Sequence, residues 1–244
     1  MSIAPPRLAC SDCPIRHRAV CAECDADELA LLETSKTYRT FAKGDQIAWA
    51  GEELGHLSSV VSGAATMSRT LADGRRQIVG LLLPSDFIGR PGRSTSPYDI
   101  VAATELTLCR FERARFEEIV RTSENVAHRL LTMTLDELDA VRDWSVVLGR
   151  MTAREKVANV LVSLARRTRA DDATPRKGPI AMTLPLPREA LADYLGLTIE
   201  TTSRQFSRLK SEGLILVPGP RDVVIPDLDR LALELADDDG GVWS

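Results

Sequence analysis

The sequence has little histidine, no phosphate-binding glycine loop and no long apolar run. Its 244 residues include only three histidines, His17, His56 and His128, and none of them belongs to a pattern of serine and carboxylate typical of a catalytic triad. No G-x-x-x-x-G-K motif occurs, which argues against a nucleotide hydrolase of the P-loop type. These absences predict that the protein is not an enzyme.

Membrane and export signals are also missing. The longest apolar run, Val79 to Leu83, is interrupted by Gly80 and is far shorter than the roughly 20 residues that a transmembrane helix needs. Near the N-terminus, Pro5, Pro6 and Arg7 lead directly to cysteines, without the basic and apolar regions of a signal peptide. We therefore expect a cytoplasmic protein without a membrane partner, whose cysteines stay free thiols because that compartment is reducing.

The cysteines themselves are few but strongly clustered. Four of the five, Cys10, Cys13, Cys21 and Cys24, lie close together, and Cys109 stands alone much later. Four thiolates are what a zinc ion or an iron-sulfur cluster requires. A zinc-stapled module made from the first four cysteines is one interpretation, but its seven-residue spacer is short for a zinc-finger loop and it leaves Cys109 unexplained.

The net charge of -4 conceals an uneven distribution. Residues 150–221 carry 13 Lys and Arg against 7 Asp and Glu, whereas residues 222–244 carry 1 against 7 and residues 1–149 carry 17 against 21. A basic excess confined to one segment indicates a DNA-binding module, although a solvated charged face would have the same composition. The acidic end, which includes Asp237, Asp238 and Asp239, is interpreted as a solvated tail.

Residues 38–111 have the pattern of an antiparallel β-roll. Short apolar runs are separated by frequent glycines, and Asp73-Gly74 stands like a hairpin turn between two runs, Ala64–Thr70 and Gln77–Leu83.

Glycine and proline are absent from residues 112–148, which predicts one long helix ending near Gly149. Two apolar faces can be traced on it, and the first has a heptad-like spacing that suits a partner helix of a homodimer. The alternative is that this face packs on the helix's own domain. The first face comprises Leu131, Thr134, Leu138, Val141, Ser145 and Leu148, and the second Leu130, Met133, Ala140, Trp144 and Val147.

The C-terminal part has the spacing of a winged helix-turn-helix. A helix is predicted over Thr152–Arg169, and two further helices, Arg188–Leu195 and Ile199–Lys210, are joined at Gly196. Leu214–Val217 and Val223–Ile225 are expected to form a hairpin wing. The inward side of the last helix is predicted to carry Ile199, Thr202, Phe206 and Leu209.

The opposite side of that helix carries groups suited to DNA. Arg204 can bind guanine O6 and N7, Glu200 can accept from cytosine N4, and Ser203 permits close approach. Each residue alone could equally belong to a solvated helix face, but the ordered set favours DNA readout. The remaining predicted contacts, several of them to phosphates, are Ser207, Arg208, Lys210 and Arg221.

These motifs resemble the FNR branch of the CRP-FNR transcription regulators, and most closely its FnrL-type oxygen sensors. The most specific match is Tyr194-Leu-Gly-Leu-Thr-Ile-Glu-Thr-Thr-Ser-Arg204, which contains the Glu-x-x-Ser-Arg signature of the family. The resemblance implies that Glu200, Ser203 and Arg204 read an inverted repeat of TTGAT type. It also implies that RNA polymerase is a partner, with the Leu71–Arg76 turn and the Arg167–Pro179 connector as candidate contacts. Thr202 departs from the usual aliphatic residue.

The same resemblance decides between possible effectors. Cyclic-nucleotide binders of the superfamily have a Gly-Glu-Leu-Gly stretch and a later Arg-Ser pair, whereas this chain has Gly89-Arg-Pro-Gly92 and Ser96-Pro-Tyr98, so no cyclic nucleotide is expected. The family instead holds an oxygen-labile [4Fe-4S] cluster. The resemblance assigns its ligands to Cys10, Cys13, Cys21 and Cys109, with Cys24 as the spare.

The expected fold class is therefore α+β, with a β-roll, a long dimerisation helix and a winged helix-turn-helix domain. The expected boundaries are a cysteine-bearing segment at 1–30, the roll at 31–116, the long helix at 117–150, the DNA-binding domain at 151–231 and an acidic tail at 232–244. Oxygen would destroy the cluster, weaken the dimer and release the operator.

Overall fold

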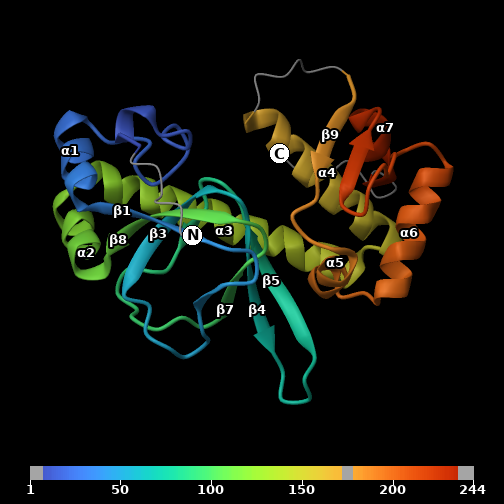
Figure 1. Ribbon diagram of the computed structural model, residues 1–244, viewed down its shortest axis with the longest axis horizontal. Helices are drawn as coiled ribbons and strands as arrows, with labels where there is room; N and C mark the ends of the chain where they lie inside the picture. Colours follow the sequence, from blue (N-terminus) through green and yellow to red (C-terminus); the bar gives the residue numbers. More distant parts are fainter. Residues whose placement is uncertain (1–7, 172–177, 236–244) are drawn as a thin grey trace. The chain divides into compact units, whose positions relative to one another are not determined.

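The structure, a computed structural model, describes residues 8–171 and 178–235. The chain divides into two compact units, residues 1–139 and 140–244, which are coloured along the chain in Figure 1. The acidic residues Asp237–Asp239 and the middle of the predicted 167–179 connector lie outside the described residues. No helix in the described part is both long and apolar enough to cross a bilayer.

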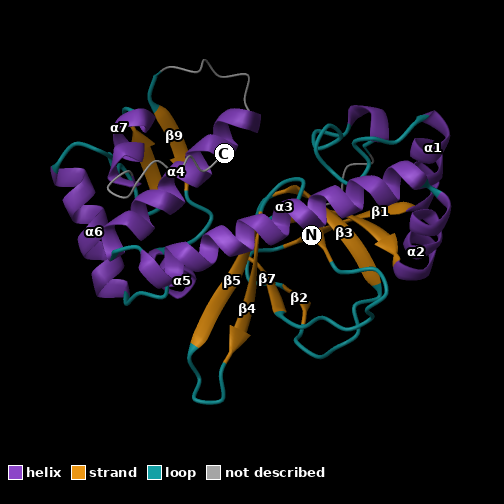
Figure 2. Ribbon diagram, turned by 180° about the vertical axis from the view of Figure 1, so that it is seen from behind, coloured by secondary structure: helices purple, strands orange, loops and turns teal. Residues whose placement is uncertain are grey.

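The first unit contains the predicted antiparallel roll, built from two four-stranded sheets (Figure 2). The two sheets form a jelly roll, the arrangement expected for a roll like that of the cyclic-nucleotide binders. One sheet has the order β1 (Lys36–Phe41), β8 (Leu106–Glu112), β3 (His56–Ser62) and β6 (Phe87–Ile88), and the other β2 (Gln46–Ala48), β7 (Asp99–Ala102), β4 (Ala65–Thr70) and β5 (Arg76–Leu82).

The predicted hairpin around Asp73-Gly74 is confirmed as β4 and β5. The first strand begins one residue later than predicted, and the second begins and ends one residue earlier. Gly74 has a φ of +86° in the turn, which glycine tolerates because it lacks a Cβ atom. At Gly63, with φ +82°, an added Cβ would lie 1.9 Å from the carbonyl oxygen of Glu105. Glycine there allows the turn after β3 to approach the strand β8.

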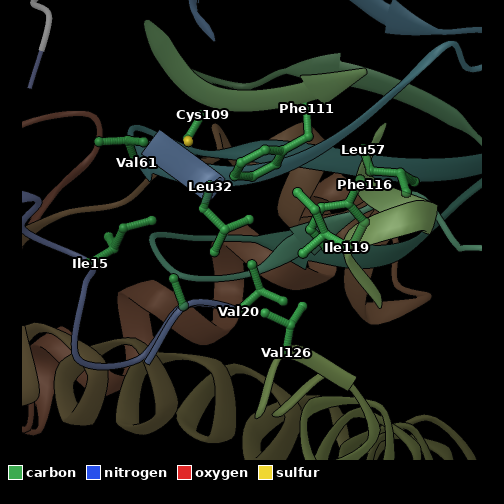
Figure 3. Packing of buried hydrophobic residues seen from close by; sticks show 11 residues of the cluster. Ile15, Val20, Leu32, Leu57, Val61, Cys109, Phe111, Phe116, Ile119 and Val126 are labelled. Atoms are coloured by element: carbon green, nitrogen blue, oxygen red, sulfur yellow. The ribbon is translucent and has the colours of Figure 1, made fainter. Parts of the chain in front are cut away.

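The sheet β1-β8-β3-β6 separates two apolar clusters because successive strand residues point to opposite faces. Along β8, Leu106 and Leu108 face the interior of the roll, whereas Cys109 and Phe111 belong to a cluster on the other face. That second cluster, shown in Figure 3, also contains residues of the N-terminal segment, α1 (Ala26–Ser35) and α2 (Arg113–Thr122). The predicted cysteine segment is thus packed on the outside of the roll.

The single long helix predicted over residues 112–149 is wrong at its start. The structure has α2 (Arg113–Thr122) and α3 (Glu124–Arg150), separated at Ser123, so the dimerisation helix does not begin at residue 117. Ser123 is extended, with φ -108° and ψ 113°, and its hydroxyl accepts a hydrogen bond of 3.1 Å from the backbone N–H of Val126. Serine is a favoured N-cap, and this cap starts a new helix without glycine or proline.

The second unit contains the predicted helix-turn-helix. Gly196 adopts the left-handed conformation that ends α5, and Thr198 caps α6 by accepting from the N–H of Thr201 at 3.2 Å. The elements of this unit that follow α3 are α4 (Ala153–Asp171), β9 (Ile180–Thr183), α5 (Arg188–Leu195), α6 (Ile199–Ser211), β10 (Asp222–Ile225), α7 (Leu228–Ala232) and a short 3-10 helix, Leu233–Leu235.

The predicted wing is only partly correct. Between the two predicted strands only one bridge forms, from Leu216 to Val224. The main partner of β10 is β9, whose residues were not predicted as a strand because four residues between two prolines carry little pattern. The Thr183 hydroxyl donates to Asp222 across this pair at 2.7 Å.

Candidate functional site

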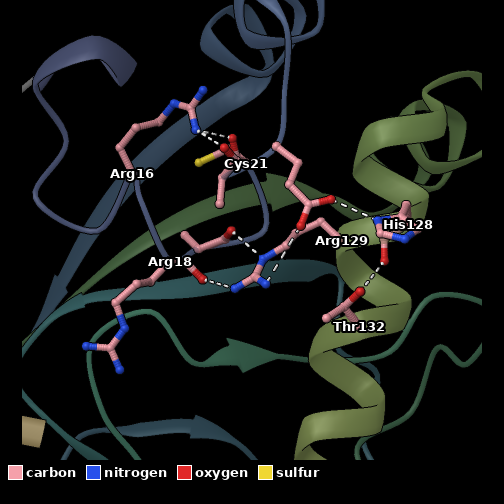
Figure 4. Close-up of polar contacts among 9 residues, drawn as sticks. Arg16, Arg18, Cys21, His128, Arg129 and Thr132 are labelled. Carbon is pink, nitrogen blue, oxygen red and sulfur yellow. Dashed lines mark hydrogen bonds and ion pairs between the residues drawn. The ribbon is translucent and has the colours of Figure 1, made fainter. Parts of the chain in front are cut away.

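The four N-terminal cysteines occur in two similar tight turns. The N–H of Cys13 donates to the carbonyl of Cys10 at 3.4 Å, and the N–H of Cys24 donates to the carbonyl of Cys21 at 3.2 Å. Arg16 holds the second turn by donating to the carbonyl oxygens of Cys21, Ala22 and Cys24 (Figure 4). One guanidinium group therefore fixes the backbone of both cysteines in this turn.

Cys109 lies in the middle of β8, between β1 and β3. Cys109 belongs to the outer apolar cluster, and Cys13, Cys21 and Cys24 pack against that cluster. Cys10 is buried, and the Lys36 ammonium group donates to its Sγ at 3.2 Å. All five thiols are free. The fold thus brings the N-terminal cysteines to the face of the sheet on which Cys109 lies.

The pKa pattern relates Cys109 to three of the other four thiols. Burial raises the pKa of Cys109, and negative charge on Cys10, Cys13 and Cys21 raises it further. Cys24 is not among the largest contributors to this shift. These shifts indicate that the predicted ligand set shares one electrostatic neighbourhood.

Cys24 has a different environment. Its pKa is raised to about 12 by burial, by Cys21 and by the carboxylates of Glu28 and Asp25, with Arg16 opposing them. For Cys21, burial raises the pKa and Arg16 is the strongest opposing charge. Nearby carboxylates thus oppose a thiolate at Cys24, and the role of Cys24 as the spare stays a prediction.

The side chains of this region determine which kind of metal group it could hold. Among residues 8–171 and 178–235, no three His, Cys, Asp or Glu side chains converge closely enough to hold one metal ion. A four-iron cluster takes its four thiolate ligands on separate irons, so they need not meet at one atom. The buried hydroxyl of Ser59, which is opposite Cys109 in the β3–β8 register and has no partner in the described part, also favours an additional group here. The chemistry of the donor set fits a cluster.

The cysteine segment is bonded to the first turns of α3. Arg129 donates to the carbonyl oxygens of Arg18 at 2.6 Å and Ala19 at 3.4 Å, and His128 Nδ1 lies 2.8 Å from a carboxylate oxygen of Glu23 (Figure 4). These bonds connect residues more than 100 positions apart in the sequence. The position of the segment and the position of α3 therefore depend on each other.

Glu28 makes a second connection to the start of α3. It forms a capping box with Asp25 at the N-terminus of α1. Its two carboxylate oxygens also accept from the Ser123 hydroxyl at 2.5 Å and from Asn125 Nδ2 at 2.8 Å. The pKa of Glu28 is lowered, first by the hydrogen bond from Ser123. Because Ser123 is the N-cap of α3, one carboxylate joins the caps of both helices.

The predicted dimer face of α3 is solvent-exposed in the single chain. Leu131, Leu138 and Val141 are 58%, 44% and 50% exposed. The hydroxyls of Thr134 and Ser145 bond to carbonyls one turn earlier in α3, so they need no other partner. Leu148 is half-buried. Leu135 and Val146 add to the exposed apolar surface of α3 and were not predicted.

The second predicted face of α3 is covered within each unit. Leu130 and Met133 pack against the outer cluster of the roll. In the second unit, Val147 is buried and Trp144 stacks on Tyr194 of α5 with ring centroids 4.3 Å apart. Ala140 is exposed, contrary to prediction. The second face is otherwise covered as predicted, whereas Leu131, Leu138 and Val141 of the first face are exposed in the described part of the chain.

The predicted DNA-reading side of α6 is open. Thr202, Phe206 and Leu209 are buried, but Ile199 is 43% exposed, so its predicted inward position is wrong. Ile199 is the first residue of α6, and the buried side of the helix begins only at Thr202. Arg221 is half-buried after the loop that precedes β10. The exposed predicted contacts are Glu200, Ser203, Arg204, Ser207, Arg208 and Lys210.

Two arginines fix α6 within its unit. Arg188 of α5 lies over the Phe206 ring, 3.4 Å from its centroid. Arg154 of α4 donates to Glu234 at 2.5 Å and also binds Glu212 at the end of α6. The reading side is thus presented by a helix that is held at its middle and its end.

Arg16, Glu28, Arg129 and Arg154 were missed by the sequence analysis. The Asp25-x-x-Glu28 spacing is a recognisable capping box, so the role of Glu28 at the N-terminus of α1 could have been predicted. Its contact with Ser123 spans 95 positions, and one sequence holds no local signal for such a pair.

Comparisons with known proteins agree with this arrangement. Residues 155–234 match the Crp-like helix-turn-helix domain family, and residues 38–123 match the cyclic nucleotide-binding domain family. The chain is 54% identical over 234 residues to the transcriptional activator protein FnrL of Cereibacter sphaeroides, covering 96% of this chain and 94% of that protein. It is 37% identical over 217 residues to the nitrogen fixation regulation protein FixK of Bradyrhizobium diazoefficiens, covering 88% and 89%.

Among solved structures, the chain resembles FixK2 from Bradyrhizobium japonicum with a TM-score of 0.74 and 31% identity. The similarity covers 85% of this chain and 99% of that one. The roll, the helix after it and the helix-turn-helix therefore occur together in a related protein.

Proposed function

The chain belongs to the CRP-FNR family of transcription activators, which are not enzymes, and from this premise we propose that it is an oxygen-responsive regulator. A [4Fe-4S] cluster bound without oxygen would favour a homodimer on DNA, and oxygen would remove the cluster. The observation that carries the proposal is the convergence of the N-terminal cysteines on the face of Cys109. Access to DNA requires a cytoplasmic location.

Cys10, Cys13, Cys21 and Cys109 would hold the cluster, which supplies the oxygen-sensitive chemistry. The raised pKa values of Cys10, Cys21 and Cys109 keep these three thiols protonated in the folded chain. Ligation would displace those protons, so assembly of the site is coupled to folding of the segment.

The segment's contacts supply a route from ligation to the dimer. Arg129 binds the backbone of Arg18 and Ala19, and Glu28 binds Ser123 and Asn125. Both sets of hydrogen bonds involve residues at the start of α3. The exposed face of this helix carries Leu131, Leu138 and Val141. Docking the segment would thus hold the dimerisation helix in one position.

Glu28→Gln should weaken this coupling without removing a cluster ligand. The neutral amide makes weaker hydrogen bonds to Ser123 and Asn125 than a carboxylate, by about 1 kcal/mol in all. We expect normal iron content but an approximately fivefold weaker dimer, measured by sedimentation equilibrium without oxygen. Glu118→Gln is the control because Glu118 is exposed and pairs with Arg121. Equal dimer affinity in both variants would contradict the coupling role.

On DNA, each protomer would place α6 in one major groove of an inverted TTGAT-type repeat, with the two half-sites about one helical turn apart. Glu200, Ser203 and Arg204 would contact bases, and Ser207, Arg208, Lys210 and Arg221 would supply further contacts, including phosphates. The dimer would then recruit RNA polymerase.

Arg204→Ala should reduce affinity for the intact operator by roughly 10- to 100-fold, because a bidentate guanine contact contributes about 1–3 kcal/mol. Discrimination at the matching guanine should also relax. Fluorescence anisotropy with the operator and with single-base variants measures both effects. Lys210→Ala is the comparison: it should weaken all sequences similarly, and an Arg204→Ala protein with unchanged base preference would exclude direct readout.

Cyclic nucleotides are not proposed as effectors, although the roll belongs to their binding-domain family. The N–H of Gly92, in the Gly89–Gly92 stretch, donates to the Glu117 carboxylate at 3.0 Å. A carboxylate at this position would repel a cyclic phosphate, and Arg113 already pairs with Glu117.

The decisive experiment is anaerobic purification followed by visible spectroscopy and assays of iron and acid-labile sulfide. We expect a brown protein with about four iron and four sulfide per chain, whose absorbance and operator binding are lost together in air. A colourless protein with zinc that binds DNA equally well in air would instead support a zinc-stapled regulator of the same fold.

A further inference from the structure

One row of side chains crosses the whole sheet β1-β8-β3-β6 at the level of Cys109. Tyr38 and Ser59 are the direct cross-strand partners of Cys109, and Phe87 is the partner of Ser59. Directly opposed residues in antiparallel strands point to the same face, with Cβ atoms about 4.5–5.5 Å apart. Ser59 therefore lies beside Cys109 on the face where the N-terminal cysteines converge.

Ser59 is a polar residue with no polar partner. Its side chain is 2% exposed, and its hydroxyl makes no hydrogen bond within the described residues. Buried hydroxyls are nearly always bonded in native proteins, because an unpaired one loses its interaction with water without replacement. Tyr38, the other polar member of the row, contacts the carbonyl of Leu8 at 3.4 Å. Ser59 is the member whose partner is missing.

The sulfur of Cys109, when it is a cluster ligand, would provide that partner. A neutral thiol is a weak acceptor, whereas a buried thiolate requires hydrogen-bond donors to replace water. The neighbouring site already shows such a pairing, since Lys36 donates to the sulfur of Cys10 at 3.2 Å. Among the directly paired neighbours of Cys109, Ser59 has a hydroxyl proton that is not used elsewhere in the described structure.

We propose that Ser59 donates a hydrogen bond to the sulfur of Cys109 when that sulfur is a deprotonated cluster ligand, and thereby prolongs the life of the cluster in air. The inference rests on the proposed function. A donor to a ligating sulfur stabilises the more negative, reduced state of a cluster and opposes its oxidation. Ser59 is thus a positioning and tuning residue, not a ligand.

Ser59→Ala tests this with two measurements, one on the iron-loaded protein and one on the iron-free protein. In the iron-loaded protein, the half-life of the visible absorbance in air-saturated buffer should shorten roughly tenfold, as expected for losing one hydrogen bond to a charged group. In the iron-free protein, Tm should be unchanged or higher, because the substitution removes an unpaired buried hydroxyl. A serine that is only structural would not produce this pair of effects.

Ser58→Ala is the matched control. Ser58 is the preceding residue of β3 and is equally buried, at 3% exposure, but it points to the opposite face of the sheet. Its substitution should leave the half-life in air at the wild-type value. A wild-type half-life in Ser59→Ala, or a lower Tm of its iron-free form, would overturn the inference.

Failure of the inference can be told apart from failure of the proposed function. Iron and sulfide in the wild-type protein are measured first. If they are present and Ser59→Ala behaves like Ser58→Ala, the inference is wrong and the cluster proposal stands. If the wild-type protein binds no iron, both are overturned.

Discussion

Cys21→Ser is expected to give a protein without cluster absorbance and without operator binding, whereas Cys24→Ser should keep both. The two residues occupy the same turn, held by Arg16, so their substitution by an almost isosteric residue tests ligation with little change in packing. Cys21 influences the ionisation of Cys109, whereas Cys24 is surrounded by Cys21, Glu28 and Asp25. A thiolate is less favourable beside carboxylates.

The measurements are anaerobic iron and sulfide content, the visible spectrum and operator affinity. Cys109→Ser is the positive control, because loss of the roll's only candidate thiol should also abolish the cluster. The reverse result, with iron retained in Cys21→Ser and lost in Cys24→Ser, would reassign the third ligand. Retention in both single variants would mean that the two cysteines can substitute for each other.

Leu138→Glu should produce a monomer whose affinity for the inverted repeat falls by at least roughly a hundredfold. Leu138 is 44% exposed at the middle of the face that includes Leu131 and Val141. Burying an unpaired carboxylate at a helix seam costs about 3–5 kcal/mol, and each 1.4 kcal/mol corresponds to about a factor of ten in affinity. A monomer also presents only one recognition helix to two half-sites.

Sedimentation equilibrium and operator titration measure these two effects. Leu71→Glu is a suitable control because Leu71 is 48% exposed but lies at the β4–β5 turn. It should leave the association state unchanged. A Leu138→Glu protein that stays dimeric would move the dimer contact away from this face of α3.

The sequence predicted best those features that depend on spacing within a short segment. Gly196 and Thr198 mark the turn between α5 and α6, and the alternation of Thr202, Phe206 and Leu209 with exposed polar residues separates the buried side from the reading side. Both patterns lie within one or two helical turns, so they can be recognised in the sequence without knowledge of the rest of the fold.

Other features depend on contacts between distant segments or on weak local preferences. Ser123 ends α2 and caps α3, yet serine is also common elsewhere in helices, and the prediction ran the two helices together. The strand β9 is only four residues long and is stabilised by β10. The docking of Arg129 on Arg18 and Ala19 crosses more than 100 positions and could be seen only after folding.

The exposed face of α3 has a consequence for how the protein responds to its own abundance. Because this apolar face lies on the surface of each chain, dimerisation through it would follow mass action, and at low concentration the concentration of dimer would rise with the square of the protomer concentration. Doubling synthesis would then raise the amount of DNA-binding species up to about fourfold. At a fixed oxygen level, the amount of the protein in the cell would therefore determine how much DNA-binding dimer is present.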